Sequence, residues 1–145
     1  MPFWFKTNPI LHYYGDPMRR LFVVAALIFV IAVPLWGDLL PFGENAHLLQ
    51  IAIAIGLVIL AGLTNPRSIA IFAVTMVAAA LGTFLLEASA ISFFPIDSFL
   101  LFSAREVAAI VLLFALYFSV KTLRAMMVGS IGGKRDVLKK QDQKE

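Results

Sequence analysis

Charged residues are missing from four long stretches of this chain, and that pattern restricts the possible folds more than any other feature of the sequence. The four uncharged stretches are bounded by Arg20 and Asp38, His47 and Arg67, Arg67 and Glu87, and Glu106 and Lys121. A helix needs about 20 mostly apolar residues to cross a bilayer. The stretches therefore predict four membrane-spanning helices.

The overall composition points the same way. The chain of 145 residues is 61% hydrophobic and 14% charged, whereas a soluble domain is nearer a quarter charged. A bilayer solvates such an apolar exterior, so we expect one membrane domain and no soluble one. The absence of cysteine excludes disulfides, thiolate catalysis and cysteine metal sites.

The predicted fold class is therefore an all-α membrane protein, a bundle of four transmembrane helices over residues 17–128. The expected spans are residues 17–36, 46–63, 66–87 and 104–128. Asp16-Pro17 and Asn65-Pro66 each provide a capping side chain followed by a proline at the first helical position. Residues 1–16 are predicted to form an aromatic interfacial arm, and residues 129–145 a mobile basic tail.

Residues 88–103 are apolar but interrupted by Pro95 and Asp97. They predict an interfacial segment or half-helix, or a re-entrant loop covered by other helices. The start of the fourth span has two interpretations. Ser103 and Glu106 fit a capping box that begins the helix at Ala104; alternatively, Asp97 is the cap and the helix begins at Ser98.

The basic residues predict the orientation. Cytoplasmic loops are enriched in Lys and Arg. With both termini in the cytoplasm, Arg105 is the only one of the twelve lysines and arginines on the outer side. The sequence thus predicts an N-in, C-in protein. Short loops, small size and the lack of a glycosylation sequon favour the plasma membrane of a prokaryote.

Ionisable groups near apolar depth are the default functional candidates, because burying an unpaired charge in a bilayer is costly. The candidate charge cluster, at the outer end of the last two spans, consists of Glu87, Asp97, Arg105 and Glu106. We expect a Glu87–Arg105 contact. The cluster is either a salt bridge that fixes two helices, which is the simpler interpretation, or a proton site, ion site or gate.

Two small-xxx-small pairs predict close helix contacts. Ala52 pairs with Gly56 in the second span, and Ala78 with Gly82 in the third. Small residues allow helix backbones to approach within a membrane. Packing inside the bundle explains both pairs, and a specific contact with another helix is the alternative.

No catalytic, metal or cofactor motif is present in the sequence. His12 and His47 are expected on opposite sides of the membrane, so they cannot share a metal ion. Small multidrug transporters also have four short spans, but the carboxylate expected in their first helix is missing from residues 21–36.

The sequence therefore favours a non-enzymatic accessory or scaffold subunit that acts by helix packing. Its expected partners are the lipid bilayer and either further copies of itself or a larger membrane complex, and not nucleic acid. The alternative is a small oligomeric channel or transporter that uses the outer charge cluster. A third possibility is a pore former of the phage-holin type, which the chain resembles in outline through its spans and charged tail.

Overall fold

The computed structural model describes residues 15–64 and 68–127, which form four helices and no strand. The helices are α1 (Gly15–Leu35), α2 (Ala46–Leu63), α3 (Ile69–Phe93) and α4 (Phe99–Met127). Each is long and apolar enough to cross a membrane. The prediction of four helical spans is confirmed to that extent. The predicted tail, and the predicted arm up to residue 14, lie outside the described residues.

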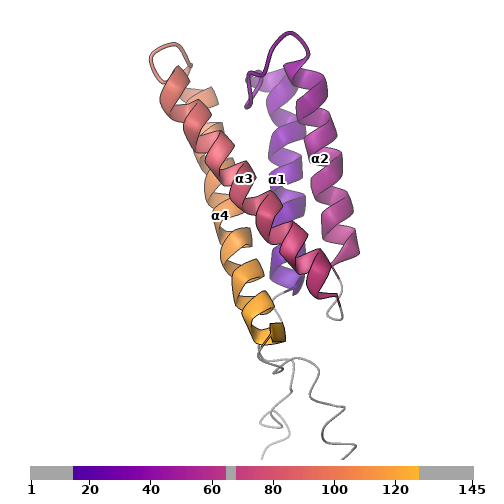
Figure 1. The fold of residues 1–145 in the computed structure, drawn as a ribbon. Helices are drawn as coiled ribbons and strands as arrows, with labels where there is room; N and C mark the ends of the chain where they lie inside the picture. The colour runs from indigo at the N-terminus through magenta and orange to yellow at the C-terminus, as the bar shows by residue number, and fades with distance from the viewer. Residues whose placement is uncertain (1–14, 65–67, 128–145) are drawn as a thin grey trace, which may run out of the picture.

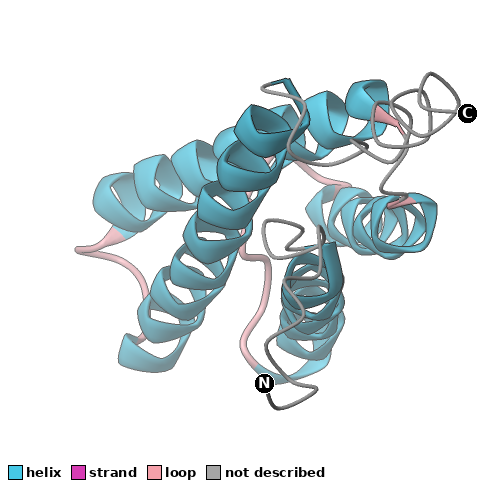
Figure 2. Cartoon of the chain, turned by 90° about the horizontal axis from the view of Figure 1, so that it is seen from below, coloured by secondary structure: helices cyan, strands magenta, loops and turns pink. Residues whose placement is uncertain are grey.

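The helices form two antiparallel hairpins, α1–α2 and α3–α4 (Figure 1). Helix α1 packs against both α2 and α4, and α3 packs along α4, whereas α2 and α3 barely touch. Viewed from below, α1 and α2 are seen nearly end-on and the other two helices lie obliquely (Figure 2). The order of packing is thus α2, α1, α4, α3. We call the end with the two hairpin connections the loop end, and the opposite end the terminal end.

The core between the helices combines a few large side chains with many alanines. On α1, Phe22 and Phe29 are buried, and on α4 the buried positions include Ala108 and Ala115. Small side chains on one helix leave room for large ones on its neighbour and let the backbones approach. Leucines, isoleucines, valines and phenylalanines cover much of the outside, as expected where lipid replaces water.

The connection between α1 and α2 turns back into the bundle at the loop end. Gly37 and Gly43 have φ angles of +102° and +82°, a region that side-chain-bearing residues rarely adopt. The Gly37 amide donates to the carbonyl of Ala32 at 2.8 Å and ends α1. Between the two glycines, Leu39 and Leu40 are buried. This connection therefore contributes to the core.

Two helix boundaries differ from the predicted ones by more than a helical turn, whereas α1, at Gly15–Leu35, differs from its predicted bounds by only one or two residues. Helix α3 continues to Phe93 instead of ending near Glu87, so most of the segment 88–103 is helical and only a short turn separates it from α4. The cap of α4 is Ser98, whose Oγ accepts a hydrogen bond from the Leu101 amide at 3.2 Å. The predicted capping box at Ser103 is wrong, because Ser103 lies inside the helix and donates to the Phe99 carbonyl.

The start of α3 lies close to its predicted position. The described helix begins at Ile69, and Ser68 caps it by accepting a hydrogen bond from the Ile71 amide at 3.4 Å. The predicted cap and first residue, Asn65 and Pro66, lie outside the described residues. Helix α2 has the predicted bounds, residues 46–63.

Candidate functional site

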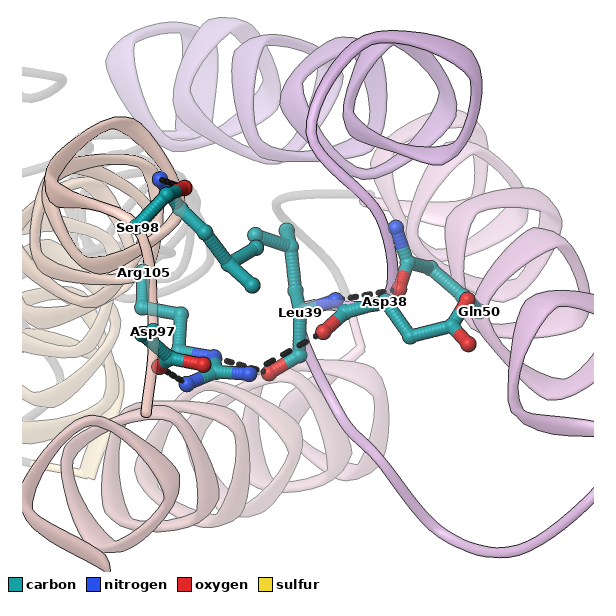
Figure 3. Close-up of polar contacts among 7 residues, drawn as sticks. Asp38, Leu39, Gln50, Asp97, Ser98 and Arg105 are labelled. Atoms are coloured by element: carbon teal, nitrogen blue, oxygen red, sulfur yellow. Dashed lines mark hydrogen bonds and ion pairs between the residues drawn. The ribbon is translucent and has the colours of Figure 1, made fainter. Parts of the chain in front are cut away.

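Arg105 is the most deeply buried charged residue in the described part of the chain, with 1% of its surface exposed. It lies in the second turn of α4 and points toward the connection between α1 and α2 (Figure 3). Its Nε donates to the carbonyl oxygen of Leu39 at 2.7 Å, and its Nη2 donates to that of Asp38 at 3.1 Å. One side chain of the second hairpin therefore holds the backbone of the first.

The remaining side of the guanidinium forms an ion pair with Asp97. The contact joins Nη1 of Arg105 to Oδ2 of Asp97, and the two side chains are 2% and 8% exposed. A charge buried this far is tolerated only when it is paired and hydrogen-bonded. The ring of Phe93 adds a cation–π contact, with its centroid 5.6 Å from Cζ of Arg105.

The ionic partner of Arg105 is thus Asp97. The predicted contact between Glu87 and Arg105 is wrong. Asp97 lies in the turn just before α4, eight positions from the arginine. Glu87 lies within α3, before the turn that contains Asp97, and Glu106 follows Arg105 on α4. Within the described residues, Glu87 forms no ion pair. Of the four residues in the predicted cluster, the structure joins Arg105 with Asp97 and leaves the two glutamates apart from that pair.

Gln50 completes the network from α2, and the sequence did not single it out as a site. Its Oε1 accepts a hydrogen bond from the Leu39 amide at 2.7 Å, and its Nε2 donates to the Phe29 carbonyl at 2.7 Å. The side chain is fully buried. An uncharged amide near the end of an otherwise apolar span was the available signal. Leu39 is therefore held on its amide side by Gln50 and on its carbonyl side by Arg105.

We call these contacts the loop-end network. Its members come from three places: the α1–α2 connection (Asp38 and Leu39), helix α2 (Gln50), and the α3–α4 turn with the start of α4 (Asp97 and Arg105). Among the described residues, no buried side-chain nitrogen or oxygen lacks a hydrogen-bond partner. A fully satisfied polar network rigidifies its surroundings, since breaking any member leaves an unpaired group at low dielectric. The network thus joins the two hairpins at the loop end.

The four predicted packing residues have different surroundings. Gly82 on α3 lies against α4, and a Cβ built there would be 2.6 Å from Cδ1 of Leu112. Gly56 on α2 has open space around it, with no atom within 4 Å of such a Cβ. Ala52 is exposed and Ala78 is half-buried. Of the two glycines, only Gly82 takes part in a close helix contact within the described chain.

A shallow apolar groove of about 230 Å³ lies where α2 and α3 diverge. Its walls follow a helical spacing on each side, with Ile53, Gly56, Leu57 and Leu60 on α2 and Ala78, Leu81, Gly82 and Leu85 on α3. Leu40 and Leu112 complete the lining. None of these described lining residues is polar, so the groove suits hydrocarbon or another apolar helix rather than water or a polar solute.

A second set of polar contacts joins helices at the terminal end. Nε of Arg19 donates to Oγ1 of Thr64, and its Nη2 donates to the Thr64 carbonyl oxygen. Thr64 follows the last residue of α2, where backbone carbonyls lack helical partners and a cation is favourable. Nearby, Ser119 of α4 contacts the sulfur of Met18 at 2.7 Å. Polar contacts thus tie α1 to α2 and to α4.

Within residues 15–64 and 68–127, no group of three or more His, Asp or Glu residues is placed to hold a metal ion. Compared with known family models, curated proteins and solved structures, the chain has no match. The class that the described residues define is a bundle of four helices, each long and apolar enough to cross a membrane, whose buried Arg105–Asp97 ion pair joins the two hairpins.

Proposed function

We propose that this protein is a non-enzymatic accessory or scaffold subunit of a membrane complex, acting through helix packing. The observation that carries the proposal is the closure of the loop-end network. Arg105 and Asp97 neutralise each other, and the remaining donors of the guanidinium go to Leu39 and Asp38. Because each nitrogen of the guanidinium is already paired within the chain, the Arg105 side chain stabilises the fold and is not left free to bind a ligand. Such an enclosed charge is typical of a scaffold.

The polar side chains deeper in the bundle support the same proposal. Thr75, Thr83 and Ser119 donate hydrogen bonds to carbonyls of their own helices, at Phe72, Ala79 and Ala115. Hydroxyls that bond back to their own helix are satisfied without water. A water-filled path needs polar groups that face a shared lumen. The described spans instead present apolar outer faces, including the groove between α2 and α3.

We infer that the protein is a multi-pass component of a prokaryotic plasma membrane with both termini in the cytoplasm. Gly15 and Met127 lie at the terminal end, which also carries Arg19, Arg20, Lys121 and Arg124. Acidic residues dominate the loop end, where Arg105 is the only described basic residue and is paired. Lysines and arginines concentrate on the cytoplasmic side of membrane proteins.

The test is purification in mild detergent, combined with photo-crosslinking from the groove. A photoreactive residue at Leu81 reports on the groove, and the same residue at Ile110, exposed on α4 and outside the groove, serves as the matched control. We expect Leu81 to capture a reproducible partner, either a larger membrane protein or a second copy, and Ile110 to capture none. Equal capture from both positions, or none from Leu81, contradicts a packing function at this face.

A small oligomeric channel or transporter is the second candidate. It is favoured by Glu87 on α3 and Glu106 on α4, two half-buried carboxylates that lie outside the loop-end network. Several copies would place a ring of such carboxylates at the loop end, as cation channels do. Ion flux into liposomes containing the purified protein, abolished by Glu87→Gln together with Glu106→Gln, would establish this function in place of the first.

A further inference from the structure

We propose that a cleft between α1 and α4 at the terminal end binds one phospholipid whose headgroup carries both a phosphate and a primary amine, as in phosphatidylethanolamine. The cleft has a volume of about 460 Å³ and is lined by Asp16, Pro17, Arg20 and Leu21 of α1 and by Phe118 of α4. This inference does not depend on the proposed function.

The lining divides into a charged part and an apolar part. Arg20 and Asp16 supply the charges, and Leu21 and Phe118 supply apolar surface beside them. Ligand clefts have volumes of about 300–1,000 Å³ and combine apolar walls with a few polar groups. At the end of a membrane-spanning helix, such a combination matches a lipid, whose charged headgroup and hydrocarbon chain meet at the same depth.

Arg20 is available to a phosphate, whereas its neighbour Arg19 is not. Arg19 is engaged with Thr64 and with Asp16, the latter at 3.6 Å. Among the described residues, the side chain of Arg20 has no hydrogen bond or ion pair, and it is exposed. Guanidinium groups bind phosphate oxygens through two parallel hydrogen bonds. Arg20 is therefore the group expected to bind the phosphate.

Asp16 determines which headgroup fits. It lies four positions before Arg20, and such neighbours on a helix have Cβ atoms about 5–6 Å apart. The contact with Arg19 uses Oδ1 of Asp16, so Oδ2 is left for another donor. In phosphatidylethanolamine, two carbons separate the ammonium group from the phosphate, so the ammonium can reach Oδ2 of Asp16 while Arg20 binds the phosphate. A second negative charge would be repelled there, and a trimethylated ammonium has no N–H group to donate.

The test measures lipid retention by native mass spectrometry on the full chain in detergent. The probes are phosphatidylethanolamine, phosphatidylcholine and phosphatidylglycerol with identical acyl chains. We expect phosphatidylethanolamine to be retained best, as one molecule per chain. Arg20→Gln should reduce its retention about ten-fold, the effect of losing a charge-assisted hydrogen bond. Asp16→Asn should remove the preference over phosphatidylglycerol.

The matched control is Arg124→Gln, which removes an exposed arginine from the last turn of α4, outside the cleft. We expect it to retain phosphatidylethanolamine as the native chain does. If the Arg20 and Arg124 variants lost phosphatidylethanolamine to the same extent, the lipid would be attracted to the whole basic end of the protein, and the proposed site would be overturned. Equal retention of all three lipids by the native chain, or tighter retention of phosphatidylglycerol, would overturn the assigned headgroup. Elution in size-exclusion chromatography verifies that each variant is folded.

Discussion

Arg105 donates a hydrogen bond to the carbonyl oxygen of Leu39, a residue 66 positions earlier in the chain, over a distance of 2.7 Å. The contact joins the second turn of α4 to the connection between α1 and α2. It binds the two hairpins at the end where α2 and α3 diverge. A buried cation that holds two backbone carbonyls and a carboxylate makes several groups depend on one side chain.

Replacing Arg105 with Met should destabilise the bundle by about 3–5 kcal/mol, because it leaves the buried Asp97 carboxylate without its partner. Arg105→Lys should be milder but still destabilising, since an ammonium cannot reach both carbonyls and the carboxylate with the same planar geometry. The measurement is thermal unfolding in detergent, followed by the loss of the monodisperse peak in size-exclusion chromatography.

Removing both charges distinguishes the contribution of the ion pair to stability from that of the rest of the network. The double variant Arg105→Met with Asp97→Asn should be more stable than the sum of the single variants allows, because no unpaired charge remains. Arg124→Met, which removes an exposed arginine on the same helix, is the control and should unfold like the native protein. Strict additivity of the two single effects would show that the pair is not coupled.

Gln50→Leu should cost about 1–2 kcal/mol, because the amide of Leu39 and the carbonyl of Phe29 lose their partner while buried. Gln50→Glu keeps the acceptor for the Leu39 amide but replaces the donor with an oxygen, and it should destabilise further as pH rises and the carboxylate ionises. Leu48→Ala on the exposed side of α2 is the comparison. A Gln50→Leu variant as stable as the native chain would contradict the role assigned to this side chain.

The two glycines on facing walls of the groove should respond oppositely to alanine. Gly82→Ala places a methyl group 2.6 Å from Cδ1 of the buried Leu112, and the overpacking should cost about 1–3 kcal/mol. Gly56→Ala meets open space and should be neutral or slightly stabilising. Adding Leu112→Val should restore part of the stability of Gly82→Ala. Similar unfolding temperatures for the two alanine variants would argue against the close α3–α4 contact.

Neighbouring arginines on α1 should differ in their effect on stability. Arg19→Gln removes the donors to Thr64 at the end of α2 and should cost about 1 kcal/mol, allowing for the partial exposure of this side chain. Arg20→Gln should leave the unfolding temperature unchanged in detergent without added lipid. The comparison needs only melting curves of the two variants. A larger drop in unfolding temperature for Arg20→Gln than for Arg19→Gln would contradict the role of Arg19 in holding the end of α2.

The orientation is testable because the chain contains no cysteine, so a single introduced thiol is the only one present. Glu44→Cys at the loop end should react in intact cells with a reagent that cannot cross the inner membrane. Arg124→Cys at the terminal end should react only after the membrane is permeabilised. The opposite labelling pattern would reverse the proposed N-in, C-in orientation.

Most of the fold could be predicted from the spacing of the charges, because a long uncharged stretch has few alternatives to a membrane-spanning helix. The bounds of α2 were predicted as observed. The end of α3 was not, since Pro95 and Asp97 interrupt the pattern but sit in a short turn after a helix that continues to Phe93. Local residue types did not show how far the helix continued before that turn.

The charge cluster was predictable as a group, but its pairing was not. The choice between Glu87 and Asp97 depends on how α4 is rotated about its axis and on where α3 ends, and neither follows from residue spacing. Leu39 could not be anticipated at all, because its part in the network is played by backbone atoms. Sequence patterns describe side chains, whereas Asp38 and Leu39 enter this network through the main chain of a loop.

The packing order α2, α1, α4, α3 has a consequence for biogenesis. Helix α1 packs against α4, which is synthesised after α2 and α3, so the two hairpins can pack together only after α4 has been translated. Before α4 is made, the face of α1 that contacts α4 is uncovered and the carbonyl of Leu39 lacks its arginine donor. The chain is synthesised from α1 to α4, whereas the contact in the middle of the packing order, between α1 and α4, is among the last that can form.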